Sequence, residues 1–451
     1  MGFNKIFIDK LVYPYMEKHK ANKIRQYIRE LKHSDKLSSQ QIYKLQRGKL
    51  KKLLLHCIDN VPAYEEFKDL RGVINKDPYE GLRQISVLTK EKFLIDHDRY
   101  ISKTVDKNTL IHNNTGGSTG EPVKFYLDRY TVEHYEAARW RSLSWWGIEP
   151  SDPSVMIWGS PIELSKASDI KYKLKERFLK NRIILPAYDI NSKKMNEYVD
   201  KINKFKPKYI YGYASALYAF SKILMDKNIY VNIPLKGVLS TAETLHDYQR
   251  KAIERAFNCP VINEYGARDG GIIAYQCPKG HMHISAENLV LEIVDIQTKK
   301  PVEIGNRGLV LVTDLNNFAM PRLRYQLGDM AIISNKETQC EINLPILESI
   351  EGREDEMFIS KDGKMVHGHY WNHIARNMSS IKQFQFIQHS NEKATLKVVK
   401  SSKFKQKDID NFVEEIENVL GVEEVNVKYM KDIPTSNSGK IRYAIREFDI
   451  D

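Results

Sequence analysis

From about residue 108 onward, short apolar runs separated by Gly, Pro and Asn alternate with stretches of helical periodicity. This alternation is typical of α/β domains, in which helices cover a sheet. It predicts helices over residues 131–146 and 195–205. The predicted strands cover residues 154–158, 209–211, 237–239, 261–263, 289–294 and 309–313. A loop follows each strand, and ligands of α/β proteins commonly bind where strands end.

The C-terminal part of the sequence reads as a separate α+β unit. Strands are predicted over 383–388, 394–400 and 424–429, and a helix over 407–420. The apolar positions of that helix share one face, as expected for packing on a sheet; they are Ile409, Phe412, Val413, Ile416 and Leu420. Since 451 residues exceed what one core usually serves, we expect a large N-terminal domain over 1–352 and a small one over 353–451.

Charge and cysteine content indicate which classes of partner and which cellular compartment to expect. The 70 Lys and Arg exceed the 58 Asp and Glu, a net charge of +12 that favours anionic partners. Nucleic acid is not expected among them, because no helix-turn-helix, zinc-finger or RNA-stacking signature accompanies the charge. Four cysteines without disulfide-like spacing, and an N-terminus unlike a secretory signal, lead us to expect a cytoplasmic protein.

The first 65 residues are predicted to be helical and basic. Phe3, Phe7 and Leu11 recur four apart among many lysines and arginines. We expect this apolar stripe to pack on the protein's own body; the alternative is peripheral contact with the inner face of the membrane. A second helix is predicted to begin at a capping box, Ser38 to Gln41, and to end before Pro62.

Two loops rich in Ser, Thr and Gly carry a lysine each: TGGSTGEPVK over 115–124 and PTSNSGK over 434–440. Glycines let the backbone approach a polyphosphate, and N–H groups, hydroxyls and an ammonium group can then bind it. The first loop lacks the Gly-Lys-Ser/Thr ending of the NTPase loop and precedes a predicted strand over 123–127. On its own it is either a phosphate site or a hairpin turn.

These loops and further motifs occur in the order and spacing of the adenylate-forming superfamily. The further motifs are NEYGARD over 263–269, YQLGD over 325–329 and GRED over 352–355. Within the superfamily the chain resembles the phenylacetate–CoA ligase-like family, and in particular the CapK-like branch associated with capsule and surface-polysaccharide genes. The segments that indicate this branch are LKKLLLH over 50–56, NVPAY over 60–64 and IWGSP over 157–161.

The resemblance implies a nucleotide site. The ATP phosphates would be held by Thr115, Gly116, Gly117, Ser118, Thr119, Gly120 and Lys124. The segments around adenine would be Thr241, Ala242 and Glu243 together with Tyr265 and Gly266. Asp329 would hold the ribose hydroxyls, followed by Arg353.

The resemblance also implies the catalytic groups. Lys440 takes the place of the lysine that reaches the carboxylate and the α-phosphate, on a small domain that turns at Asp355. Asp269 stands where the family commonly has a glutamate that binds Mg²⁺. Its side chain is one methylene shorter, and Glu264 is an alternative ligand.

A second group of residues resembles the structural zinc site of many family members. Cys277, His283 and Cys340 are kept, whereas Thr338 replaces a further cysteine. His281 is the candidate for the fourth ligand. The alternative is a loop that has lost its metal.

The resemblance implies a ligase that joins a small carboxylic acid to AMP and transfers the acyl group to CoA. The alternative is transfer to an amine or hydroxyl acceptor, giving an amide or ester on a surface-polysaccharide precursor. A non-catalytic binding protein of the same fold is the third hypothesis. The acid is expected to bind between the helix at 140–146, residues 211–214 and the loop at 240–243.

Overall fold

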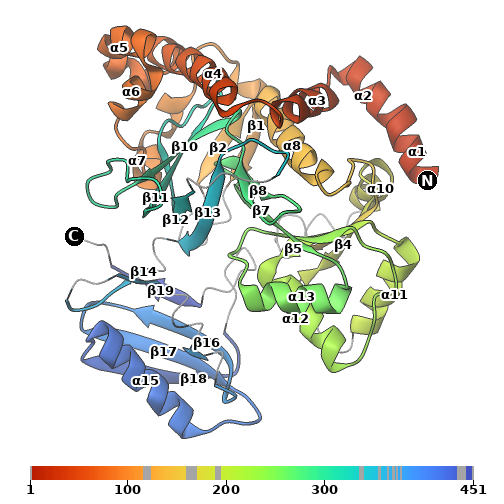
Figure 1. Cartoon of the computed structure of the whole chain (residues 1–451), viewed down its shortest axis with the longest axis vertical. Helices are drawn as coiled ribbons and strands as arrows, with labels where there is room; N and C mark the ends of the chain where they lie inside the picture. Colours follow the sequence, from red (N-terminus) through yellow and green to blue (C-terminus); the bar gives the residue numbers. More distant parts are fainter. Residues whose placement is uncertain are drawn as a thin grey trace. The chain divides into compact units, whose positions relative to one another are not determined.

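The computed structural model describes residues 3–114, 123–158, 170–187, 194–334, 340–353, 357–362, 365–367, 371, 374–375, 378–433 and 443–448. The chain divides into two compact units (Figure 1). The first contains Met1–Leu327 and Ala331–Ile350, and the second contains Gly328–Met330 and Glu351–Asp451. Whether these units act as a substrate-binding domain and a lid stays a prediction.

The first unit begins with helices: α1 (Phe3–Phe7), the π-helical η1 (Ile8–Val12), α2 (Tyr13–Lys20), α3 (Ile24–Ser34), α4 (Ser39–Asn60), η2 (Pro62–Leu70), α5 (Arg71–Lys76), α6 (Pro78–Arg83), α7 (Lys90–Ile95), η3 (His97–Tyr100) and η4 (Lys107–Thr109). The predicted capping box is confirmed, because Ser38 Oγ accepts from the Gln41 backbone N–H while the Gln41 side chain accepts from the Ser38 N–H. Helix α4 ends at Asn60 because Val61, which precedes a proline, takes the extended conformation.

One correction concerns the N-terminal stripe. Phe7 and Leu11 remain 37% and 60% exposed, so the expectation that they pack on the protein's own body is wrong.

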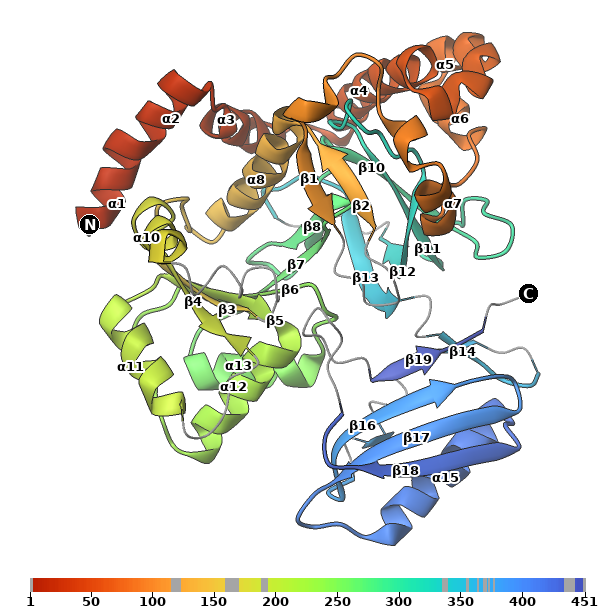
Figure 2. The ribbon, with the colours of Figure 1, turned by 180° about the vertical axis from the view of Figure 1, so that it is seen from behind.

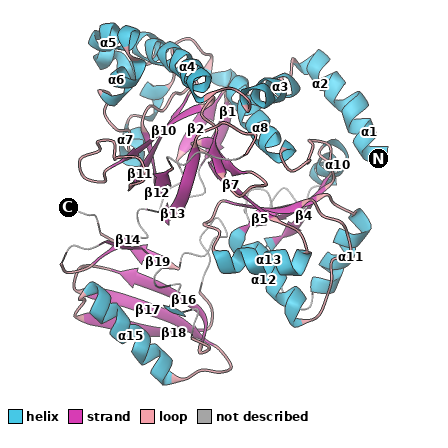
Figure 3. Cartoon of the chain, viewed as in Figure 1, coloured by secondary structure: helices cyan, strands magenta, loops and turns pink. Residues whose placement is uncertain are grey.

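The parallel part of the main sheet has the order β4-β3-β5-β6-β7. Its strands are β3 (Ser154–Trp158), β4 (Arg182–Pro186), β5 (Tyr209–Tyr213), β6 (Gly237–Thr241) and β7 (Val261–Ala267). The helices between them are α8 (Arg129–Ser144), which precedes β3, and α10 (Ile170–Leu179), α11 (Met195–Phe205), α12 (Ala214–Asp226) and α13 (Asp247–Phe257) (Figure 3).

Along each of these strands, successive side chains point to opposite faces of the sheet, and a different layer of helices covers each face. Ile210 and Val238 pack with residues of α11, α12 and α13, whereas Tyr209 and Leu239 pack with residues of α3 and α8. The parallel strands are therefore buried on both faces, which explains why they read as continuous apolar runs in the sequence.

Beyond β7 the sheet continues with antiparallel strands in the order β7-β8-β9-β13-β12-β11-β10. They are β8 (Gly271–Gln276), β9 (Met282–Ile284), β10 (Leu289–Val294), β11 (Arg307–Asp314), β12 (Tyr325–Ile333) and β13 (Ile346–Arg353). A separate hairpin pairs β1 (Ile111–Asn114) with β2 (Lys124–Leu127), as Figure 2 shows. The Ser/Thr/Gly loop connects these two strands, and its residues 115–122 lie outside the described part of the chain.

The second unit is an α+β fold. Its strands are β14 (Met357–Ile359), β15 (Met365–His367), β16 (Ile381–Gln388), β17 (Lys393–Lys400), β18 (Glu424–Met430) and β19 (Ala444–Arg446). Four of them form a sheet in the order β18-β17-β16-β19. Helix α15 (Gln406–Leu420) buries Ile409, Phe412 and Ile416 in a core shared with this sheet, which confirms the predicted helix face. The α/β fold class is thus confirmed.

Among the helices that the structure describes, none is long and apolar enough to cross a membrane.

Candidate active site

The ends of β5, β6 and β7 meet at Glu264. Its Oε1 accepts hydrogen bonds from Thr241 Oγ1 at 2.8 Å and from the Tyr211 hydroxyl at 3.2 Å, and its Oε2 accepts from Arg139 Nε at 3.0 Å. Burial, reinforced by Glu264, raises the pKa of Tyr211 well above the ordinary value, so this phenol stays protonated and donates. Both oxygens of Glu264 are thus engaged, and Arg139 balances its charge.

The segment after β6 carries a carboxylate that caps the N-terminus of helix α12. Glu243 accepts from the Ser215 backbone N–H at 2.7 Å and from Ser215 Oγ at 3.0 Å, in the first turn of α12. A carboxylate is favourable there because helix N-termini carry partial positive charge and unpaired N–H groups. Ala242 has a positive φ of 66°, a conformation that aims the chain sharply away from the strand. Glu243 of the predicted adenine segment is therefore tied to the first turn of α12.

The β7–β8 hairpin brings the motif at 263–269 to the edge of the site. A Cβ at Gly266 would lie 2.9 Å from the Gly271 carbonyl oxygen, so only glycine fits there. At the turn, Arg268 Nη1 donates to the Asn114 carbonyl oxygen at 3.4 Å. The turn thus lies against the end of β1, where the Ser/Thr/Gly loop begins.

Asp269 is held in this turn from both sides. Its Oδ2 accepts from the Tyr325 hydroxyl at 3.0 Å, and its carbonyl oxygen accepts from Arg322 Nε at 3.2 Å and Nη2 at 2.9 Å. The Arg322 guanidinium lies 4.8 Å from the ring centre of Phe125 on β2. Asp269 is half-buried, and a carboxylate of this kind is a suitable ligand for Mg²⁺, which proteins commonly hold by one or two carboxylates.

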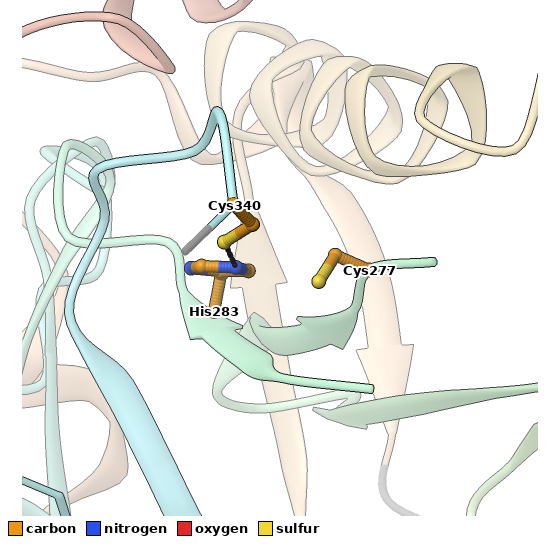
Figure 4. A group of neighbouring side chains, drawn as sticks. All are labelled: Cys277, His283 and Cys340. Atoms are coloured by element: carbon orange, nitrogen blue, oxygen red, sulfur yellow. Dashed lines mark hydrogen bonds between the residues drawn. The ribbon is translucent and has the colours of Figure 1, made fainter. Parts of the chain in front are cut away.

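A second cluster lies between β8, β9 and the segment that precedes β13 (Figure 4). The ligand atoms of Cys277, His283 and Cys340 all lie within 4.8 Å of one another, and Cys340 Sγ is 3.2 Å from His283 Nε2. His283 Nδ1 is 3.1 Å from the Leu344 carbonyl oxygen, which can only accept; Nδ1 therefore carries the proton and Nε2 faces the sulfurs.

Backbone hydrogen bonds form a tight turn at Cys277. The Cys277 N–H donates to the His281 carbonyl oxygen at 2.9 Å, and the Gly280 N–H donates to the Cys277 carbonyl oxygen at 2.9 Å. Burial raises the pKa of the Cys277 thiol, while backbone N–H groups of His281 and Lys279 act in the opposite sense. The side-chain set fits tetrahedral zinc with one position to be supplied by another ligand. Among the described residues, His281 does not join the group, contrary to its predicted place as fourth ligand.

The chain is similar in sequence to known proteins. Residues 358–447 match the family model of the CapK C-terminal domain. The chain is 25% identical over 421 residues to protein CapK of Staphylococcus aureus, covering 90% of this chain and 89% of CapK. It is 22% identical to a phenylacetate–coenzyme A ligase of Thermus thermophilus, covering 72% of this chain and 73% of the ligase.

This chain is a homologue of CapK. Its fold is shared with a 2-hydroxyisobutyryl-CoA ligase in complex with 2-HIB-AMP, with a TM-score of 0.71, 18% identity and coverage of 92% and 91% of the two chains. ATP-bound MatB of Rhodopseudomonas palustris shares it with a TM-score of 0.53, 14% identity and coverage of 73% and 66%.

The structure brings together several of the residues that the adenylate-forming resemblance predicts. Thr241, Ala242, Glu243, Tyr265, Gly266 and Asp269 lie at adjoining strand ends of the first unit. Lys124 is exposed at the start of β2, opposite Asn114. Asp329 lies on β12 and Arg353 ends β13. Residues 115–120 and Lys440 fall outside the described residues.

Sequence reasoning missed the arginines that hold this CapK-like site together. Arg139 lies 125 residues before Glu264, and Arg322 lies 53 residues after Asp269, so no local pattern signals either contact. The sequence also led us to expect the helix at 140–146 beside the acid pocket. Trp145 instead donates to Asp35 and packs edge-on against His283, and Trp146 donates to the Gln276 carbonyl oxygen. Trp158 ends β3, and its ring centre is 4.1 Å from that of Tyr213, which ends β5.

Proposed function

We propose that this chain is an AMP-forming acid–CoA ligase. It joins a small carboxylic acid to ATP, releasing pyrophosphate, and then transfers the acyl group from AMP to the CoA thiol. The observation that carries the proposal is the position of Asp269, which is held by Tyr325 and Arg322 beside the hairpin that carries the Ser/Thr/Gly loop. Phosphates bound by that loop would meet a carboxylate suited to Mg²⁺.

The residues divide the work of the first half-reaction. The loop 115–120 and Lys124 bind the phosphates, and the segments at 241–243 and 265–266 border adenine. Asp329, with Arg353, binds the ribose. Lys440 offsets the negative charge that builds up when a carboxylate attacks the α-phosphate. Magnesium bound at Asp269 would supply further charge neutralisation to the phosphates.

A second candidate function keeps the first half-reaction and changes the acceptor. Over 139 residues, 30% of this chain, the sequence is 25% identical to an indoleacetate–lysine synthetase of Pseudomonas savastanoi, whose name indicates an amine acceptor. The likeness to CapK over most of both chains favours a precursor of a surface polysaccharide as that acceptor. The chain would then form an amide or ester rather than a thioester.

One assay separates the two candidates. Pyrophosphate release from ATP is measured with aryl acids, fatty acids, amino acids and uronic acids, each with and without CoA. Release that depends on one acid, increases with CoA and yields a thioester supports the CoA ligase. Release that depends on one acid but is indifferent to CoA supports the amine or hydroxyl acceptor. Failure of every acid to promote release would contradict both.

We also propose that Cys277, His283 and Cys340 bind a structural zinc ion. Untagged protein is expected to contain about one zinc per chain by elemental analysis. The C277S variant is expected to lose the metal and to melt at least about 3 °C lower, which corresponds to roughly 1 kcal/mol in a large domain. C259S, which changes a cysteine outside the cluster, is the control and should keep its zinc. Wild-type protein without zinc would contradict the assignment.

A further inference from the structure

The N-terminal helices turn polar side chains toward the protein. Lys5 Nζ donates to Glu149 Oε2 at 2.6 Å and to Asp152 Oδ1 at 2.7 Å, and Asp152 is buried. One turn later, Asp9 accepts from Ser151 Oγ at 2.8 Å. Ion pairs and hydrogen bonds therefore attach this segment to the first unit, with Ile8 as its buried apolar residue.

Large apolar side chains of the same segment face outward. Phe7, Leu11 and Tyr15 follow one another at intervals of four residues and are 37%, 60% and 58% exposed, and Ile6 beside them is 46% exposed. A surface helix of a globular protein normally presents the opposite arrangement, with its apolar stripe toward the core. Burial within the first unit does not explain why these positions are apolar.

Helix α10 likewise exposes apolar side chains and buries a charged one. Leu174, Phe178 and Leu179 are 50%, 52% and 44% exposed. Among the α10 residues whose burial is described, Glu176 is the buried one, and it pairs with Lys180 and with Arg182. Two separate segments of one unit thus bury acidic or polar groups and expose apolar ones.

The two segments are neighbours. Asn4 Nδ2, on α1, donates to the Arg177 carbonyl oxygen on α10 at 3.1 Å and to Asn181 Oδ1 at 2.8 Å. Figures 1 and 2 show α10 beside α1 from opposite sides. We call their exposed apolar residues the docking surface; they are Ile6, Phe7, Leu11, Tyr15, Leu174, Phe178 and Leu179.

Basic residues accompany the docking surface. Among the residues of these helices whose burial is described, the exposed charged side chains are all basic. They are Lys10, Lys18, Lys171, Lys173, Lys175 and Arg177, and the exposed Lys180 follows α10. The acidic residues of these helices are engaged elsewhere: Asp9 with Ser151, Glu17 with Arg25, and Glu176 with Arg182. The surface therefore offers apolar area surrounded by positive charge.

We propose that the docking surface binds the face of an anionic phospholipid membrane. Aromatic and aliphatic side chains that enter the headgroup boundary, with lysines at the level of the phosphates, are the chemistry of helices that lie in a membrane interface. Lysine and arginine near an anionic leaflet add electrostatic attraction. The chain lies on the membrane in this arrangement, in keeping with the absence of a membrane-spanning helix among its described helices.

Vesicle flotation tests this proposal. Wild-type protein is expected to float with phosphatidylcholine vesicles that contain phosphatidylglycerol, to bind pure phosphatidylcholine weakly, and to dissociate as salt is raised. The double variant L11Q/F178Q is expected to bind the anionic vesicles about tenfold more weakly, which corresponds to about 1.4 kcal/mol. The matched control is I95Q/I304Q, which changes two apolar side chains that are 83% and 63% exposed outside the docking surface. It should bind like the wild type.

Because all four substituted side chains are exposed, equal melting temperatures are expected and verify folding. Failure of the wild type to bind anionic vesicles at low salt would overturn the proposal, as would equal binding by L11Q/F178Q. Size-exclusion chromatography with light scattering tests whether a second copy of this chain binds the docking surface instead. A dimer that L11Q/F178Q dissociates would assign the surface to a second copy of this chain, and would also overturn it.

Discussion

Replacement of Lys440 with alanine is expected to lower acid-dependent pyrophosphate release by about 10²- to 10³-fold or more, the usual cost of removing one group that stabilises transition-state charge. The carboxylate and the α-phosphate are both anionic, so their approach needs a positioned cation. Nucleotide binding is expected to persist, because the phosphate contacts proposed for the loop at 115–120 and for Lys124 are unchanged in this variant. The measurement is pyrophosphate release alongside ATP binding by calorimetry.

Lys431 provides the matched control for this prediction. It is exposed, belongs to the same unit and precedes the PTSNSGK segment. K431A is expected to retain wild-type release, since a solvated lysine contributes little at a distance. Unchanged turnover in K440A would refute the role of Lys440, and loss of ATP binding together with turnover would show that the lysine serves binding rather than the reaction.

The second large effect is expected at Arg139. In R139M the Glu264 carboxylate, only 4% exposed, keeps its bonds from Thr241 and Tyr211 but loses its cation. Breaking a buried pair from one side commonly costs about 3–5 kcal/mol. Because 30% of the Arg139 side chain is exposed, we expect about 2–3 kcal/mol of lost stability, together with reduced pyrophosphate release.

Urea denaturation followed by tryptophan fluorescence measures this loss, because four of the five tryptophans belong to the first unit. R83M is the control: Arg83 pairs with Glu80 at 3.0 Å, but both side chains are about half exposed. A surface pair of this kind is worth about 0–1 kcal/mol. Equal midpoints for R139M and R83M would show that Glu264 does not depend on Arg139.

The sequence was most informative where local pattern and burial coincide. Strands β3 and β10 were predicted at their observed bounds because their apolar runs are short and bordered by turn residues. The predicted face of α15 was correct because its periodicity repeats over four turns. The N-terminal stripe had equally clear periodicity, and yet its expected partner was wrong. Periodicity indicates that a face is apolar, but it does not say what covers that face.

The candidate site was predictable as a set of motifs rather than as a set of contacts. The resemblance indicated Thr241, Tyr265 and Asp269, which the structure places at adjoining strand ends. The groups that hold them, Arg139 and Arg322, come from distant parts of the sequence and carry no motif. Similarly, Cys340 meets His283 across 57 residues, and only the fold brings the sulfur to the ring.

Strand β7 has a parallel neighbour, β6, on one side and an antiparallel neighbour, β8, on the other. On one face of the parallel half, the side chains pack in a core with α11, α12 and α13, whereas Tyr325 and Phe125, which flank the Asp269 turn, belong to another core. Substitutions in separate cores usually have additive effects. Substitutions in the core with α11, α12 and α13 are therefore expected to leave the part that carries Asp269 intact, so that the two parts of one sheet can change independently during evolution.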